Sequence, residues 1–166
     1  YDTSGKNNLE FVLINSLGAP RACCSKSILL ENKFNPEISI GEDKELWSRI
    51  AIKSPIYYHS NKTFIEIEHN NRSINNDNGI ANLKTIKYIA NNTIVSKKIK
   101  NSLISNAHFK ISTYHISKNK KIKAIFYLIK SIFTNLNNYK TKHKIYIIFS
   151  LITGLKKQVL KEYISL

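Results

Sequence analysis

Apolar residues follow two different periods along the chain, and the change between them falls near residue 79. Residues 63–69 alternate apolar and polar side chains, which predicts a half-buried strand, and residues 56–59 predict a shorter one. From residue 80 onward, apolar residues recur every three or four positions, which predicts helices. We therefore expect an α/β segment over residues 1–79, followed by an α-helical region over residues 80–166.

Within the first part, one amphipathic helix is expected after a glycine turn. Asp43 is a good N-cap residue for it, and Pro55 stops the pattern. Glu45 and Arg49 are four residues apart and can pair along the exposed side of this helix. Three apolar residues recur at the spacing of one helical face: Leu46, Trp47 and Ile50.

The remaining elements are expected from shorter patterns. Residues 9–17 are mostly apolar and fit either a short strand or a buried turn of helix. Ser25 is placed to cap a short helix that ends near residues 31–32. Beyond residue 79, the helical pattern covers residues 80–107, 109–116, 122–133 and 144–164, with a charged turn at residues 118–121.

Charge divides the chain at the same place as periodicity. The formal net charge is +15. Residues 1–79 hold nine Lys or Arg against ten Asp or Glu, whereas residues 80–166 hold seventeen lysines and one acid, Glu162. This excess predicts that the helical region meets an anionic partner, such as a phospholipid surface, nucleic acid or an acidic protein.

Two features of the composition bear on context. The chain contains no methionine and begins with Tyr1, so we interpret it as a fragment of a longer protein. Cys23 and Cys24 are adjacent and have no metal-ligand spacing, and neighbouring cysteines rarely pair with each other. We expect both to be small core residues in a reducing compartment.

The candidate chemistry lies around the helix start. A carboxylate at a turn-to-helix junction, as in Asp43 beside Glu42, can act as a general base. His69 and Arg72 follow the predicted strand, where they can stabilise a leaving phosphate, and His69 can alternatively bind a divalent cation. Each residue also has a plainer interpretation: an N-cap for Asp43, a polar residue of an edge strand facing water for His69, a solvated loop charge for Arg72, and a core residue for Trp47.

A resemblance adds to this pattern. Residues 34–37, Phe-Asn-Pro-Glu, and residues 41–51, Gly-Glu-Asp-Lys-Glu-Leu-Trp-Ser-Arg-Ile-Ala, resemble the signature of family 2 glycosyltransferases. That signature reads Phe-Asp-x-x, a gap, and Glu-Asp-x-x-Leu-Trp-x-Arg, and Asn35 here replaces the usual acid. The resemblance covers about residues 1–75 and implies the acceptor half of a GT-A fold.

The resemblance implies a role for each candidate residue. Asp43 would be the base of an inverting transfer from a nucleotide-sugar donor to a hydroxyl of a glycan or lipid-linked acceptor. Glu42 and Trp47 would bind or orient the acceptor, and His69 and Arg72 would hold the donor phosphates. A divalent cation, Mg²⁺ or Mn²⁺, would be bound mainly by a preceding half with an Asp-x-Asp motif, with His69 as a further ligand. This chain lacks that motif, so we expect it to be inactive alone.

The basic helices allow a second class of function. Helices rich in Ile, Phe, Tyr and Lys suit the surface of an anionic membrane, where each lysine contributes on the order of 1 kcal/mol. We expect a cytoplasmic protein that associates peripherally with the inner face of the cell membrane through residues 80–166. The alternatives are a non-catalytic module that binds anionic membrane or nucleic acid, an interaction scaffold, and plain solvated helices. Nucleic acid is the less favoured partner, because no arginine follows Arg72 and no reader motif is present.

Overall fold

A computed structural model describes residues 8–15, 22–57, 78–136 and 141–153 of the chain. The chain divides into two compact units, Tyr1–Val95 (unit 1) and Ser96–Leu166 (unit 2), which are described separately. This division reflects packing, whereas the predicted boundary after residue 79 reflects charge and periodicity and stays a prediction.

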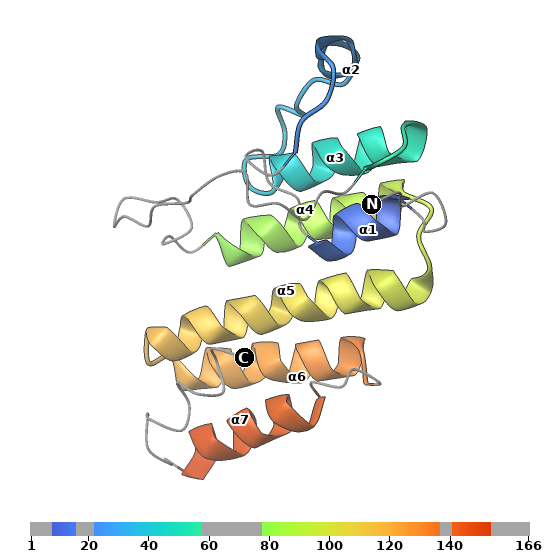
Figure 1. Cartoon of the computed structure of the whole chain (residues 1–166). Coiled ribbons are helices and arrows are strands. Elements are labelled where there is room, and N and C mark those ends of the chain that lie inside the picture. The colour runs from blue at the N-terminus through green and yellow to red at the C-terminus, as the bar shows by residue number, and fades with distance from the viewer. Residues whose placement is uncertain (1–7, 16–21, 58–77, 137–140, 154–166) are drawn as a thin grey trace. The chain divides into compact units, whose positions relative to one another are not determined.

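Unit 1 contains four helices among its described residues (Figure 1): α1 (Asn8–Asn15), α2 (Lys26–Glu31), α3 (Glu42–Lys53) and α4 (Gly79–Asn92). Helix α3 contacts both α1 and α4. The apolar positions of α3 follow the helical period because one face is buried. The core residues of these three helices are Leu9, Val12, Leu13, Leu46, Trp47, Ile50, Ala51, Leu83, Ile86, Ile89 and Ala90.

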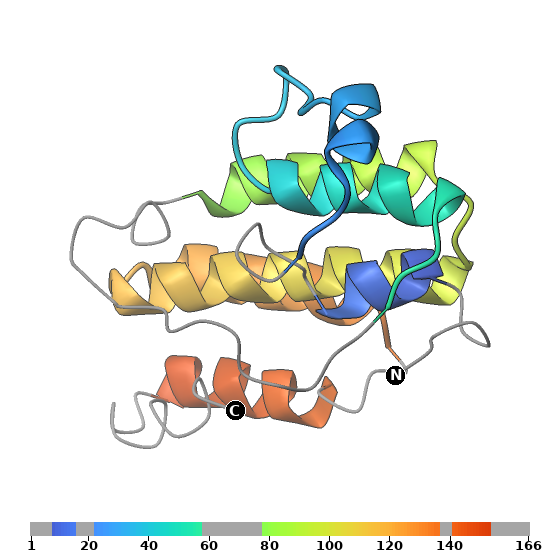
Figure 2. The ribbon, with the colours of Figure 1, turned by 45° about the horizontal axis from the view of Figure 1, so that its top comes forward.

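In residues 96–136 and 141–153, unit 2 forms three consecutive helices: α5 (Lys97–Ser117), α6 (Lys121–Thr134) and α7 (Thr141–Thr153). Helix α6 packs against both α5 and α7, and α5 and α6 run side by side in both views (Figures 1 and 2). The core of α6 and α7 consists of Ala124, Leu128, Ile147 and Leu151, with Phe109, Ile116, Ile125 and Ile148 packed around it.

Several local predictions are confirmed. Ser25 is the N-cap of α2, where its Oγ accepts a hydrogen bond from the Ile28 N–H at 3.4 Å. Of the segment at residues 9–17, for which the pattern fitted a strand or a helix, residues 9–15 belong to helix α1 and the last two lie outside the described residues. The helix expected at residues 122–133 is α6, whose bounds differ by one residue at each end.

The predicted α/β fold is wrong. Every regular element that the structure describes is a helix, and the acceptor half of a GT-A fold needs a sheet. The strand expected at residues 63–69 lies outside the described residues, and of the one expected at 56–59 only Ile56 and Tyr57 are described. The helix start that carried the resemblance, residues 41–51, does not require a sheet, because a turn and an amphipathic helix are local features.

Candidate functional site

The start of helix α3 is built on Gly41, not on Asp43 as predicted. Gly41 is the N-cap residue, with φ of 79° in the left-handed region that favours glycine. Its carbonyl accepts the Glu45 N–H at 3.1 Å. The turn is attached to α4, because the Thr85 hydroxyl donates to the Ile40 carbonyl at 2.6 Å. Asp43 therefore lies inside the first turn of the helix.

The predicted catalytic residues are only partly described. Glu42 and Asp43 are half-buried in the first turn of α3, and Trp47 is 6% exposed within the core of unit 1. The Trp47 indole N–H is buried without a hydrogen-bond partner. Because the whole side chain is buried, Trp47 is a core residue. His69 and Arg72 lie outside the described residues, and their proposed approach to Asp43 stays a prediction.

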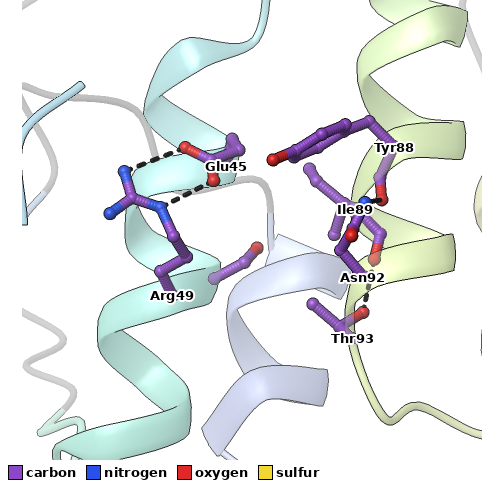
Figure 3. A pocket seen from close by; sticks show the side chains of 7 residues that line it. Glu45, Arg49, Tyr88, Ile89, Asn92 and Thr93 are labelled. Atoms are coloured by element: carbon purple, nitrogen blue, oxygen red, sulfur yellow. Dashed lines mark hydrogen bonds and ion pairs between the residues drawn. The ribbon is translucent and has the colours of Figure 1, made fainter. Parts of the chain in front are cut away.

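Glu45 and Arg49 form the predicted i,i+4 pair, but the pair is not on an exposed face. The Arg49 guanidinium donates from Nε to Glu45 Oε1 at 2.6 Å and from Nη2 to Oε2 at 3.0 Å (Figure 3). Arg49 Nη2 also donates to the Lys33 carbonyl at 2.6 Å. Glu45 is 3% exposed, so this bidentate pair joins a buried carboxylate to the preceding loop.

A small cavity lies between α3 and α4 beside this ion pair, as Figure 3 shows. Its volume of about 100 Å³ is well below the roughly 300 Å³ at which sites for small molecules begin. Its polar side chains already bond to backbone carbonyls: Ser48 to Lys44, Asn92 to Tyr88 and Thr93 to Ile89. We therefore interpret this cavity as a packing feature of unit 1 and not as a substrate cleft.

Metal ligands are likewise not assembled in the part of the chain that the structure covers. None of its His, Cys, Asp and Glu side chains form a group of three or more that could hold an ion. The divalent cation stays a prediction, since His69 is outside that part. Cys23 is exposed and Cys24 half-buried; the prediction that both are core residues is wrong, because they precede α2, which buries no residue.

A more distinctive feature is the outer face of helix α6 in unit 2. Four large apolar side chains recur there at intervals of four, three and four residues and face solvent. We call this set the α6 stripe: Ile122 (86% exposed), Phe126 (51%), Ile129 (41%) and Phe133 (75%). The opposite face of the helix is buried through Ala124, Leu128 and Ser131. Helix α6 is thus apolar on both sides, which is unusual for a helix at the surface.

Helix α7 repeats this arrangement on a shorter scale. Ile145, Phe149 and Ile152 are spaced four and three residues apart and are 54%, 57% and 69% exposed. Its other side is buried through Ile147 and Leu151, which belong to the core shared with α6. Two neighbouring helices therefore each present an apolar row to solvent.

The described residues of unit 2 carry formal charge of one sign only. Residues 96–136 and 141–153, the described part of unit 2, contain eleven lysines and no Asp or Glu. Lys130 lies on the α6 stripe itself, with its Nζ 4.2 Å from the centre of the Phe126 ring. This contact is a cation–π interaction, in which the lysine stem covers apolar surface while the ammonium stays hydrated.

Among the described lysines of unit 2, one is buried. Lys144 of α7 is 0% exposed, and its Nζ donates to Ser105 Oγ of α5 at 2.9 Å. Ser105 and Ser131 each donate their hydroxyl to the other's backbone carbonyl, at 2.7 and 2.6 Å, which joins α5 to α6. The Lys144 ammonium also lies 5.8 Å from the centre of the Phe109 ring. These contacts tie three helices together at one point.

Sequence reasoning missed both features of unit 2. The segment at residues 122–133 was predicted as an apolar helix, and a signal for its exposed row was present, because apolar residues occupy both faces of the helix. The burial of Lys144 has no signal in the sequence, since it is one of seventeen lysines in residues 80–166.

Comparisons with protein-family models, with curated proteins and with solved structures found no match for this chain. Together with the helical fold, this result overturns the resemblance to family 2 glycosyltransferases. Glycosyl transfer, the nucleotide-sugar donor and the glycan or lipid-linked acceptor are tested by neither finding and stay predictions.

None of the helices that the structure describes combines the length and the apolar character that crossing a bilayer requires.

Proposed function

We propose that unit 2 binds an anionic phospholipid surface through helices α6 and α7. The observation that carries this proposal is the α6 stripe, Ile122, Phe126, Ile129 and Phe133, exposed on a helix whose described surroundings carry only positive formal charge. Exposed apolar rows of this size mark an interaction surface. The absence of acids among the described residues of unit 2 makes an anionic partner the complementary one.

The geometry of α6 suits a helix that lies in the plane of the bilayer surface. Ile122 and Phe133 are eleven residues apart, which is about 16 Å along a helix. Apolar side chains of this size can enter the boundary between headgroups and acyl chains, where full burial of each contributes about 1.5–3 kcal/mol. Lys130, now over the Phe126 ring, can extend toward lipid phosphates while its stem stays on the apolar row.

Nucleic acid is the competing anionic partner, and the exposed rows argue against it. Phosphate contacts account for the affinity of basic surfaces for nucleic acid and do not need isoleucine at the contact. The basic residues after Arg72 are all lysines, whereas base recognition favours the planar arginine fork. A lipid surface accounts for the lysines and the apolar rows together.

The test is binding of the full chain to vesicles. We expect sedimentation with vesicles that contain phosphatidylglycerol and little with pure phosphatidylcholine. Replacing Phe126 and Phe133 by serine should weaken binding at least tenfold, because two apolar anchors worth more than about 1.4 kcal/mol together are lost. Both side chains are largely exposed, so the far-UV circular dichroism spectrum should not change.

A matched control replaces two apolar side chains outside unit 2. Ile52 and Ile80 of unit 1 are 55% and 49% exposed, and serine at both should leave vesicle binding within about twofold. The proposal is wrong if Phe126→Ser/Phe133→Ser binds vesicles like the original chain. It is also wrong if the protein binds DNA with a steep salt dependence but does not bind vesicles.

A further inference from the structure

The turn between α5 and α6 is a rigid feature of unit 2. Asn119 adopts φ of 56°, the left-handed conformation that asparagine tolerates better than most residues. The Lys120 N–H donates to the His115 carbonyl at 2.8 Å, and the Asn119 N–H donates to the Ile116 carbonyl at 2.9 Å. This pair of bonds is the Schellman arrangement that ends a helix and fixes the direction of the following chain.

This turn and the first residues of α6 hold the largest group of lysines in the described part of unit 2. Four of the six residues from 118 to 123 are lysines, and all four are exposed. We call them the tip lysines: Lys118, Lys120, Lys121 and Lys123. Among these lysines, in the first turn of α6, lies Ile122, the first residue of the α6 stripe and the most exposed of its four members.

We infer that the tip lysines bind a lipid headgroup that carries two covalently joined phosphates. The inference rests on the proposed function, since the apolar row beginning at Ile122 places this end of α6 at the same lipid surface. It goes further by assigning the headgroup contact to one turn and by naming the chemistry that this turn prefers.

The preference for two linked phosphates follows from the number of lysines in this short segment. Four ammonium groups on six residues repel one another, and no described acid of unit 2 offsets them. A single monovalent phosphate neutralises only one of them. Two linked phosphates can contact several lysines, and the entropy cost of immobilising the headgroup is incurred only once. The flexible lysine stems can adjust to a phosphate pair, and clusters of four or more lysines are typical sites for multiply charged lipids.

The position of Ile122 favours a phospholipid over a dissolved anion as the ligand of the tip lysines. This side chain is 86% exposed and lies between two of the tip lysines. A dissolved anion offers nothing to an isoleucine, whereas a headgroup presents acyl chains directly below its phosphates.

The experiment compares two vesicle compositions with the same phosphate and acyl-chain content. One contains cardiolipin, whose two phosphates are joined by glycerol, and the other contains phosphatidylglycerol at twice the molar fraction. We expect the full chain to bind the cardiolipin vesicles about tenfold more tightly, which corresponds to about 1.4 kcal/mol. Replacing all four tip lysines by glutamine should remove this preference.

The matched control removes the same number of charges from elsewhere in the same unit. Lys97, Lys98, Lys100 and Lys110 lie on α5, and glutamine at all four should weaken binding to both compositions while the tenfold preference remains. Circular dichroism of both variants checks that the helices are intact.

The possible results separate this inference from the proposed function. Equal binding of the original chain to both compositions overturns the diphosphate preference, although the proposed membrane binding would stand. A preference that persists without the tip lysines overturns the assignment to this turn. Binding of free pyrophosphate as tight as binding to cardiolipin vesicles overturns the lipid source, and failure to bind either vesicle overturns the proposed function as well.

Discussion

Units 1 and 2 each bury one strongly charged side chain among their described residues, and they stabilise it differently. In unit 1 the carboxylate of Glu45 is 3% exposed and meets a cation, the guanidinium of Arg49, through two hydrogen bonds. In unit 2 the ammonium of Lys144 is 0% exposed and donates to a neutral hydroxyl, that of Ser105. The first arrangement needs both signs of charge, and the second fits a unit whose described residues contain no acid.

This difference shows that the two units stabilise a buried charge with partners of different kinds. Taking a charge out of water costs several kcal/mol unless partners replace the lost hydration. Arg49 supplies a full opposite charge to Glu45. Ser105 and the Phe109 ring present dipoles to the Lys144 ammonium. Because the whole Lys144 side chain is buried, we expect the packing of its stem to contribute a large part of its effect on stability.

The largest effect should come from removing the Lys144 side chain. We expect Lys144→Ala to lower the free energy of unfolding by about 2–4 kcal/mol, because loss of a fully buried long side chain leaves a cavity where three helices meet. Urea denaturation followed by circular dichroism measures this change.

The companion variant Lys144→Met keeps the volume and removes the charge. Its free energy of unfolding should equal or exceed that of the original chain, since replacing a buried charge by an apolar group of similar size is often neutral or stabilising. A loss as large as that of the alanine variant would mean that the ammonium is the stabilising group, and would contradict our comparison.

A smaller effect is expected from the ion pair in unit 1. Glu45→Ala should lower the free energy of unfolding by about 1–2 kcal/mol, since hydrogen bonds to a charged group are lost. The Arg49 side chain is 35% exposed, so water can replace part of the hydrogen bonding that its guanidinium loses when Glu45 is removed. A double-mutant cycle with Arg49→Ala should give a coupling energy of about 1 kcal/mol.

The control for this cycle is an acid on the surface of the same unit. Glu37 is exposed, and Glu37→Ala should change the free energy of unfolding by no more than about 0.5 kcal/mol. A coupling energy near zero between Glu45 and Arg49 would show that the buried pair contributes no more than a surface pair.

The sequence predicted the local elements of unit 1 better than their surroundings. The helix after the glycine turn, the Ser25 cap and the pairing of Glu45 with Arg49 all follow from spacing within one turn of helix. The exposure of that pair depends on which neighbours cover α3, and spacing carries no such information. Asp43 was misplaced as the N-cap because Gly41 adopts a left-handed conformation that its sequence neighbours do not reveal.

The fold class and the candidate site were predicted less well, for a related reason. The resemblance at residues 34–51 described a turn and a helix start, which many folds contain, while the sheet was inferred from residues 56–69, nearly all outside the described part. In unit 2 the helices and the excess of lysines were predicted from the sequence. The exposure of the α6 stripe was not predicted, because the sequence of a helix that is apolar on both faces does not indicate which face its neighbours cover.

A second comparison between the units concerns their left-handed residues, and its effects should be no larger than that of Glu45→Ala. Gly41 of unit 1 and Asn119 of unit 2 are the two residues with positive φ among those described. Gly41→Ala should lower the free energy of unfolding by about 1–2 kcal/mol, because alanine is strained there and its Cβ would lie 3.3 Å from Thr85 Cγ2. Asn119→Gly should raise it by a few tenths of a kcal/mol, since glycine is the residue best suited to this position in a Schellman turn. Thermal unfolding of both variants measures the difference, and a destabilising glycine at position 119 would show that the asparagine side chain, not the backbone conformation, holds the α5–α6 turn.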